Sequence, residues 1–256
     1  MTRLVVHSGF HGPDTAALNR LVHHNHHELR AAGLEVLHRA YMIGLEAAVE
    51  RSATANSRYD PVWGGRSWAE RALTAEAIGD ARAVILTGKG LAGRMPGWRD
   101  VIGYDHLPPA IEGVAQGLAE AGHDIALHYT LCPPEVFLDH CHWTLLTGAA
   151  IAMTRDAFWA RYHAAADLIG MVERIRARLD PIPVTWAMID GEEPNPTPLY
   201  HAAGLDPKGI VDLLPPPRRR RRGYDPALEQ EILALHDSPN HRAMIDRISD
   251  LLREAE

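Results

Sequence analysis

The chain has 256 residues, of which 46% are hydrophobic, a length that suits one large core because single cores stop growing at roughly 250–300 residues. A net charge of −7 and a sequence pI near 6.1 exclude an extended face for nucleic acid or anionic lipid, since phosphate contacts need a positive excess. We therefore expect a single domain over residues 1–256, with no nucleic-acid partner and no membrane partner.

Targeting and redox signals are weak. No apolar run approaches the ~18–20 residues that cross a bilayer, and a short strand follows the N-terminal Arg3 without a signal-peptide pattern, so we expect a cytoplasmic protein. Two cysteines, Cys132 and Cys141, are too few for a disulfide framework. A free, reduced pair is the expected state.

The first half of the chain alternates strand and helix signals. Residues 3–8 predict a strand, Gly9 to Asp14 a turn, and residues 15–32 a helix that Gly33 ends. Polar residues 51–67, with Pro61, Gly64 and Gly65, predict a surface loop that could act as a lid or substrate segment. Further expected strands are 34–37, 83–87 and 124–129, and further expected helices are 68–78 and 107–121.

The second half continues with a helix at 135–146, one or two long helices over 155–179 and a strand at 183–188. Residues 215–223 form a Pro/Arg-rich loop, and helices at 226–235 and 241–252 close the chain. This alternation predicts an α/β fold, a single domain with a central, mostly parallel sheet flanked by helices on both faces.

Three stretches carry a family resemblance: VVHSGFHGPDTAALNRLVHHNHHELRAAGLEVL at 5–37, AVILTGKGL at 83–91, and LHYTLCPPEVFLDHCHWTLLTG at 127–148. In their order and spacing they resemble the bacterial sulfotransferase-like proteins of the P-loop type. The resemblance implies a P-loop fold and a site for the sulfonate donor 3′-phosphoadenosine 5′-phosphosulfate. Sulfuryl transfer to a small-molecule hydroxyl or amine is the implied reaction. The cofactor-binding positions that it implies are Gly9, Gly12, Thr15, His140, Arg221, Arg222 and Gly223.

The sequence departs from the family pattern in each stretch. Gly12 stands where the family has the loop lysine that stabilises the leaving oxygen, Pro13 removes an N–H donor, and Asp14 adds negative charge. Lys89 falls near the family's general base, and Cys132 falls near its 3′-phosphate arginine. Donor binding is therefore either lost or rebuilt from other groups.

Several groups have two interpretations. The N-terminal turn either binds an anion or only joins strand to helix, with Asp14 as the N-cap. Lys89 either replaces the loop lysine or is solvated, and the run from Arg218 to Arg222 either covers a 3′-phosphate, recruits an acidic partner or is solvated. His11 and Lys89 are the candidate catalytic residues.

The sixteen histidines raise the question of metal. His23 or His24 with His27 has helical chelating spacing, but a solvated helix face is favoured and we predict no metal site. Cys132 and Cys141 with His140 and His142 could form a nucleophilic or soft-metal set. The favoured alternative is that Cys141 is a core residue.

Two function classes follow. The first is a divergent sulfotransferase-like transferase acting on a small-molecule substrate with a modified site. The second is a catalytically inactive member of the fold that serves as a binding or assembly subunit with a protein partner, and a homo-oligomer is open in both.

Overall fold

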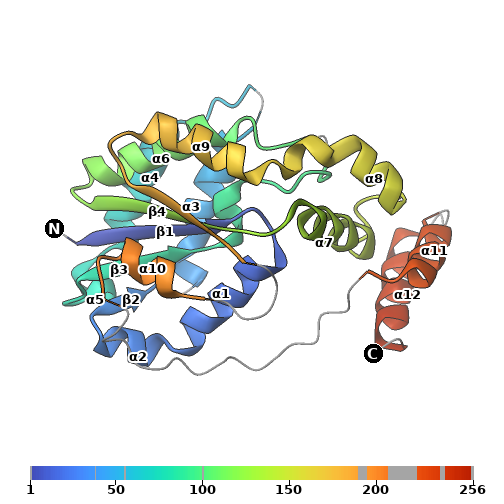
Figure 1. The fold of residues 1–256 in the computed structure, drawn as a ribbon, viewed down its shortest axis with the longest axis horizontal. Helices are drawn as coiled ribbons and strands as arrows, with labels where there is room; N and C mark the ends of the chain where they lie inside the picture. The colour runs from blue at the N-terminus through green and yellow to red at the C-terminus, as the bar shows by residue number, and fades with distance from the viewer. Residues whose placement is uncertain are drawn as a thin grey trace.

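The first strand of the chain lies at the centre of a five-stranded, all-parallel sheet with the order β2-β3-β1-β4-β5 (Figure 1). The structure, a computed structural model, describes residues 2–37, 39–54, 56–99, 101–189, 195–206, 224–236 and 240–254. The strands are β1 (Arg3–Gly9), β2 (Leu34–Val36), β3 (Ala83–Thr87), β4 (Asp124–Leu131) and β5 (Val184–Met188). The prediction of an α/β domain with a parallel sheet is confirmed.

Helices cover both faces of the sheet because strand side chains alternate between the faces. Leu4 and Val6 of β1 belong to the larger core, under α3 (Arg39–Ser52), α4 (Pro61–Ala72), α6 (Leu107–Glu120) and α9 (Leu168–Leu179). Val5 belongs to the second core, under α1 (Pro13–His24), α2 (His26–Ala31) and α10 (Thr197–Ala202). The short elements α5 (Ala75–Ile78), η1 (Lys89–Ala92) and η2 (His163–Ala166) complete the body.

Four helices lie beyond the carboxyl edge of the sheet (Figure 1), namely α7 (Pro134–Thr147), α8 (Arg155–Tyr162), α11 (Pro226–Leu235) and α12 (His241–Glu254). Leu146 of α7 packs against Leu228 and Ile232 of α11 and against Met244, Ile248 and Leu251 of α12. The α11–α12 pair, here called the C-terminal arm, therefore has its own small core on α7.

The predicted loop over 51–67 is shorter in the structure, since α3 runs to Ser52 and α4 begins at Pro61. Asp60 caps α4 by accepting a hydrogen bond from the Val62 N–H at 2.9 Å. The glycines that suggested a loop are packing positions: a Cβ on Gly65 would lie 2.5 Å from the Val114 carbonyl oxygen of α6. Small residues let these two helices approach closely, and a lid role for this segment stays a prediction.

The predicted helix over 15–32 is broken at Asn25, which separates α1 from α2 with φ −104° and ψ 27°. Its buried side chain donates to the Leu21 carbonyl at 2.8 Å. The segment 155–179, predicted as one or two helices, consists of α8, η2 and α9. None of the helices in the described ranges combines the length and apolar character of a bilayer-crossing segment.

Candidate functional site at the carboxyl edge of the sheet

The ends of β1, β3 and β4 bring the predicted site segments together at one edge of the sheet. The connection after β1 leads to β2 on one side, and the connection after β4 leads to β5 on the other. Adjacent strands whose connections diverge in this way leave a crevice at their carboxyl ends, where open α/β sheets bind ligands. The turn from Gly9 to Gly12 lies at this position.

The turn from Gly9 to Gly12 is short, and α1 begins directly after it. Gly12 precedes α1 with φ −68° and ψ 158° and supplies no side-chain cap, and Pro13 occupies the first turn. His11 adopts a positive φ of 58°, a conformation that is uncommon for residues other than glycine. Because the early N–H groups of a helix lack intrahelical partners, an uncapped first turn favours an anion.

Gly9 and Thr15 are joined beneath the turn. A Cβ on Gly9 would overlap Thr15 Oγ1 and would lie 2.7 Å from Thr130 Oγ1, so only glycine fits there. Thr15 is buried, and its Oγ1 lies 3.4 Å from Thr130 Oγ1. The Thr15 hydroxyl therefore faces the sheet and not a ligand above the turn.

Thr130 belongs to a row of polar side chains that crosses the sheet, here called the buried row: Thr15, Thr87, His7, Thr130 and His128, which are buried, and Thr185, which is exposed at its end. His7 Nδ1 lies 2.8 Å from Thr87 Oγ1, and His7 Nε2 lies 3.2 Å from Thr130 Oγ1. On β4, His128 Nδ1 lies 2.9 Å from Thr185 Oγ1, and the His7 and His128 rings stack at 6.0 Å. The row ties β3, β1, β4 and β5 together directly under the turn.

Burial keeps both of these imidazoles neutral. Desolvation, with a smaller effect of His128, lowers the pKa of His7 from 6.5 to about 3. Desolvation also lowers the pKa of His128 to about 4. The buried row is therefore a network of neutral hydrogen bonds at physiological pH.

His11 is held on the outer side of the turn, where its Nδ1 lies 3.0 Å from Tyr104 Oη. Desolvation and then the charge of Lys89 lower the pKa of His11 to about 4, while a hydrogen bond with the Gly93 backbone acts in the opposite direction. His11 is therefore neutral. Lys89, which is exposed, is near enough to lower the pKa of His11. The structure brings these two predicted catalytic residues to the same place.

Two carboxylates that the sequence reasoning missed lie at this edge. Glu46 of α3 accepts a hydrogen bond from the Gly90 N–H at 3.0 Å, and a Cβ on Gly88 would overlap its Oε1. Glu50 lies one turn further along α3; desolvation raises its pKa, Arg94 lowers it and Glu46 raises it. The segment after β3, which contains Lys89 and Arg94, therefore lies close to two carboxylates of α3.

Cys132 follows β4 and packs against the turn, since a Cβ on Gly12 would lie 2.8 Å from Cys132 Sγ. Both cysteines are free and buried. Burial, followed by the charge of Cys132, raises the pKa of the Cys141 thiol, which disfavours the thiolate that a nucleophile or metal ligand requires. The structure agrees with the interpretation of Cys141 as a core residue.

The remaining residues predicted for the donor site are His140 and the segment from Arg221 to Gly223. His140 lies within α7, where its Nε2 is 3.5 Å from Thr144 Oγ1. Arg221, Arg222 and Gly223, together with the whole loop over 215–223, lie outside the described residues.

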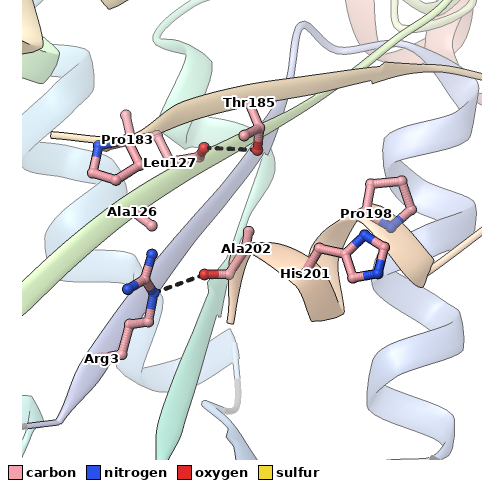
Figure 2. Close-up of a pocket in the computed structure, with 8 residues that line it drawn as sticks. All are labelled: Arg3, Ala126, Leu127, Pro183, Thr185, Pro198, His201 and Ala202. Carbon is pink, nitrogen blue, oxygen red and sulfur yellow. Dashed lines mark hydrogen bonds between the residues drawn. The ribbon is translucent and has the colours of Figure 1, made fainter. Parts of the chain in front are cut away.

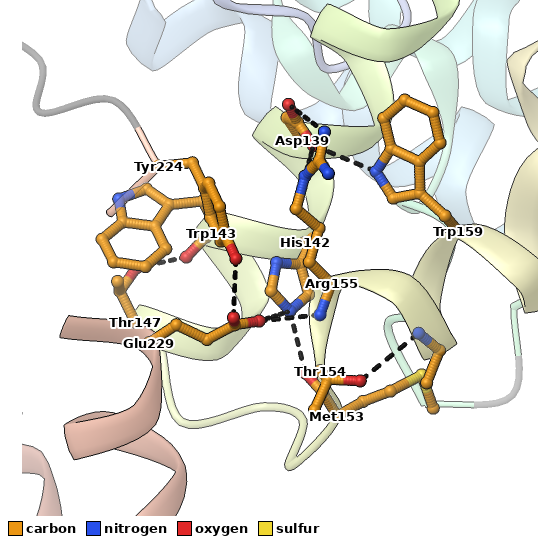
Figure 3. A network of polar contacts seen from close by, with 11 residues as sticks. Asp139, His142, Trp143, Thr147, Met153, Thr154, Arg155, Trp159, Tyr224 and Glu229 are labelled. Carbon is orange, nitrogen blue, oxygen red and sulfur yellow. Dashed lines mark hydrogen bonds and ion pairs between the residues drawn. The ribbon is translucent and has the colours of Figure 1, made fainter. Parts of the chain in front are cut away.

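His142 belongs to a different polar cluster, the Glu229 network, which attaches the C-terminal arm (Figure 3). Glu229 Oε1 accepts from the Arg155 backbone N–H at 2.7 Å and lies 3.6 Å from His142 Nε2, and its Oε2 accepts from Tyr224 Oη at 2.7 Å. The Arg155 guanidinium is paired with Asp139 at 2.6 Å and lies over the Trp159 ring. This cluster explains His142 as a structural residue.

The histidine-rich segment from His23 to His27 spans the break between α1 and α2. The break at Asn25 interrupts the helical spacing between His23 and His27, and the His26 and His27 rings pack at 3.9 Å. Within the part of the chain that the structure describes, no group of three or more His, Cys, Asp or Glu side chains is placed to hold a metal ion.

Comparisons with models of known protein families and with curated protein sequences find no match to this chain. The fold and the site therefore define a class only: an all-parallel α/β protein whose polar side chains gather at the carboxyl edge of β1, β3 and β4.

Proposed function

We propose that the chain is a divergent sulfotransferase-like protein that binds the sulfate or phosphate group of a small anionic molecule at the turn from Gly9 to Gly12. The observation that carries this proposal is that Lys89 of η1 is near enough to His11 for its charge to lower the His11 pKa, with the uncapped first turn of α1 directly after His11. Lys89 then supplies the positive charge that Gly12 cannot. Helix N–H groups and a cation together are a common anion-binding arrangement.

The surrounding residues fit a transferred anionic group better than they fit a whole nucleotide. As the bond between the sulfuryl or phosphoryl group and the oxygen of its donor breaks and the bond to the acceptor forms, Lys89 would stabilise the negative charge that develops on the leaving oxygen. Glu50, with its raised pKa, would accept the proton of a hydroxyl or amine acceptor. His140, one candidate contact to a 3′-phosphate, lies 3.5 Å from Thr144 Oγ1 of its own helix, and we propose no step through 3′-phosphoadenosine 5′-phosphosulfate.

The second candidate is a catalytically inactive binding or assembly subunit. It is favoured by the loss of two groups from the ligand side: the Thr15 hydroxyl is turned toward Thr130, and Cys132 packs against Gly12. A lysine restored at position 12 would have to displace the Cys132 sulfur. This contact supports a turn whose role is to join strand to helix.

Ligand-dependent thermal unfolding tests the binding proposal. A ligand at 100 times its Kd stabilises the folded state by about 2.7 kcal/mol, so inorganic sulfate and 3′-phosphoadenosine 5′-phosphate should each raise the Tm in proportion to their affinity. Lys89→Gln should lower the affinity for whichever probe binds by about tenfold, the value of one charge-assisted contact. Arg71→Gln, at an exposed arginine of α4, is the matched control and should leave binding unchanged.

Three outcomes separate the candidates. No Tm shift with either probe would remove the binding proposal, and equal affinity of the Lys89→Gln variant would remove the role of Lys89. Binding without group transfer to phenol or amine acceptors would favour the inactive subunit.

A further inference from the structure

A cavity of about 330 Å³ lies on the α10 face of the sheet, away from the turn (Figure 2). It is lined by side chains from β1, β4, β5 and α10, among them Arg3, Ala126, Pro183, Thr185, Pro198 and His201. Arg3 is the first residue of β1 and Gly9 is the last, so the two sites are separated by roughly 20 Å of strand. The cavity is therefore distinct from the carboxyl-edge site.

The Arg3 guanidinium is held in place at this cavity by two contacts. Its Nε donates to the Ala202 carbonyl at 2.8 Å, and its Nη1 donates to Asp124 Oδ2 at 3.0 Å. A guanidinium has five N–H donors, and these two contacts use one on Nε and one on Nη1. The remaining donors on Nη1 and Nη2 suit the two oxygens of a carboxylate.

The other walls define the body of a ligand. Ala126, Pro183 and Pro198 present apolar surface, and the small Ala126 side chain leaves the space above β4 open. His201, an exposed residue of α10, provides a second polar group at the rim. The hydroxyl of Thr185 is already hydrogen-bonded to His128 and to the Leu127 carbonyl. The polar groups of a ligand would therefore bind Arg3 and His201.

We propose that this cavity is a second ligand site, for a small molecule with a compact apolar body and one carboxylate. The apolar walls take the body, and the end of the Arg3 guanidinium takes the carboxylate. The Arg3–Asp124 pair is partly exposed, so its charges are screened by water. The site therefore binds such ligands weakly and selects for the carboxylate by geometry.

Benzoate is the probe, with benzamide as its neutral isostere, in a ¹⁵N NMR titration of the full chain. We expect saturable shifts at Ala126, Thr185 and His201 with a Kd on the order of 1–10 mM, typical of so small a ligand. Benzamide should bind about tenfold more weakly, and Arg3→Gln should lose about the same factor. Arg253→Gln, at an exposed arginine of α12, is the matched control and should bind benzoate normally.

His201→Ala, at an exposed position that should not perturb folding, is the second variant and should weaken benzoate binding several-fold. The proposal is overturned by any of three results: no saturable shift up to about 50 mM benzoate, several times the expected Kd; equal binding of benzamide; or unchanged affinity in both cavity variants. Shifts centred on Gly9 to Gly12 would also overturn it, and would place the carboxylate at the anion site proposed above.

Discussion

The buried row and the Glu229 network both contain a buried histidine, but they solve the problem of burial in opposite ways. His7 contacts two threonine hydroxyls, and the row holds no acidic or basic partner for it. The buried Glu229 side chain accepts hydrogen bonds from the Arg155 N–H and the Tyr224 hydroxyl and lies 3.6 Å from His142 Nε2, which is bonded to the Met153 carbonyl at 2.8 Å. The neighbouring Arg155–Asp139 pair is partly exposed. Threonine hydroxyls are the partners of the buried histidines in the row, whereas a buried acidic side chain and a backbone carbonyl lie beside the buried histidine where the C-terminal arm is attached.

The largest expected effect is the acid sensitivity of the buried row. The folded-state pKa values of His7 and His128 are lowered to about 3 and about 4, so their stabilising contribution is complete above the unfolded value of 6.5 and is lost as the pH falls toward these values. At pH 5 each histidine should cost about 2 kcal/mol relative to pH 7.5. Urea unfolding at the two pH values measures the loss.

A variant separates this loss from the general effect of acid. His128→Gln should reduce the difference between pH 7.5 and pH 5 by about 2 kcal/mol, whereas the exposed His163 replaced by Gln should not change it. An unchanged difference in the His128 variant would contradict the assignment of the pH dependence to the row.

The Glu229 network should respond to the loss of its central carboxylate. Glu229→Ala removes the acceptor for the Arg155 N–H and the Tyr224 hydroxyl, and breaking one side of a buried charged cluster costs about 3 kcal/mol. Hydrogen exchange of α11 and α12 should accelerate while that of β1 and β3 is retained, because the C-terminal arm has its own small core. Glu231→Ala, at an exposed position of the same helix, is the control. Equal hydrogen-exchange protection of α11 and α12 in the two variants would argue against the Glu229 network as the attachment of the C-terminal arm.

The smallest of these effects is steric and lies where the row meets the turn. Gly9→Ala places a methyl group against Thr15 and Thr130, and overpacking of this kind costs about 2 kcal/mol. Gly103→Ala is the control, because its Cβ would make an ordinary 3.7 Å contact with the Ala165 Cβ. Thermal unfolding of both variants gives the comparison, and equal Tm values would show that the turn has room to move.

The strands were predictable from the sequence because buried parallel strands are short apolar runs between turn residues. The glycines at 64 and 65 misled the loop prediction, since their close contact with α6 is a tertiary feature. The helix α3 was missed, although Met42, Leu45 and Val49 have helical spacing. The placement of Glu46 against Gly88 and Gly90 was beyond sequence reasoning, because no local pattern links positions 44 residues apart.

The central position of β1 also affects how the protein forms during synthesis. Arg3 is paired with Ala83 on one side and with Asp124 on the other, so the first strand made must wait for both neighbours. At about 5–20 residues per second, the interval before β4 emerges is on the order of ten seconds. During that time the apolar β1 segment depends on transient partners or on chaperones, and the order of translation, more than the final stability, sets its exposure to aggregation.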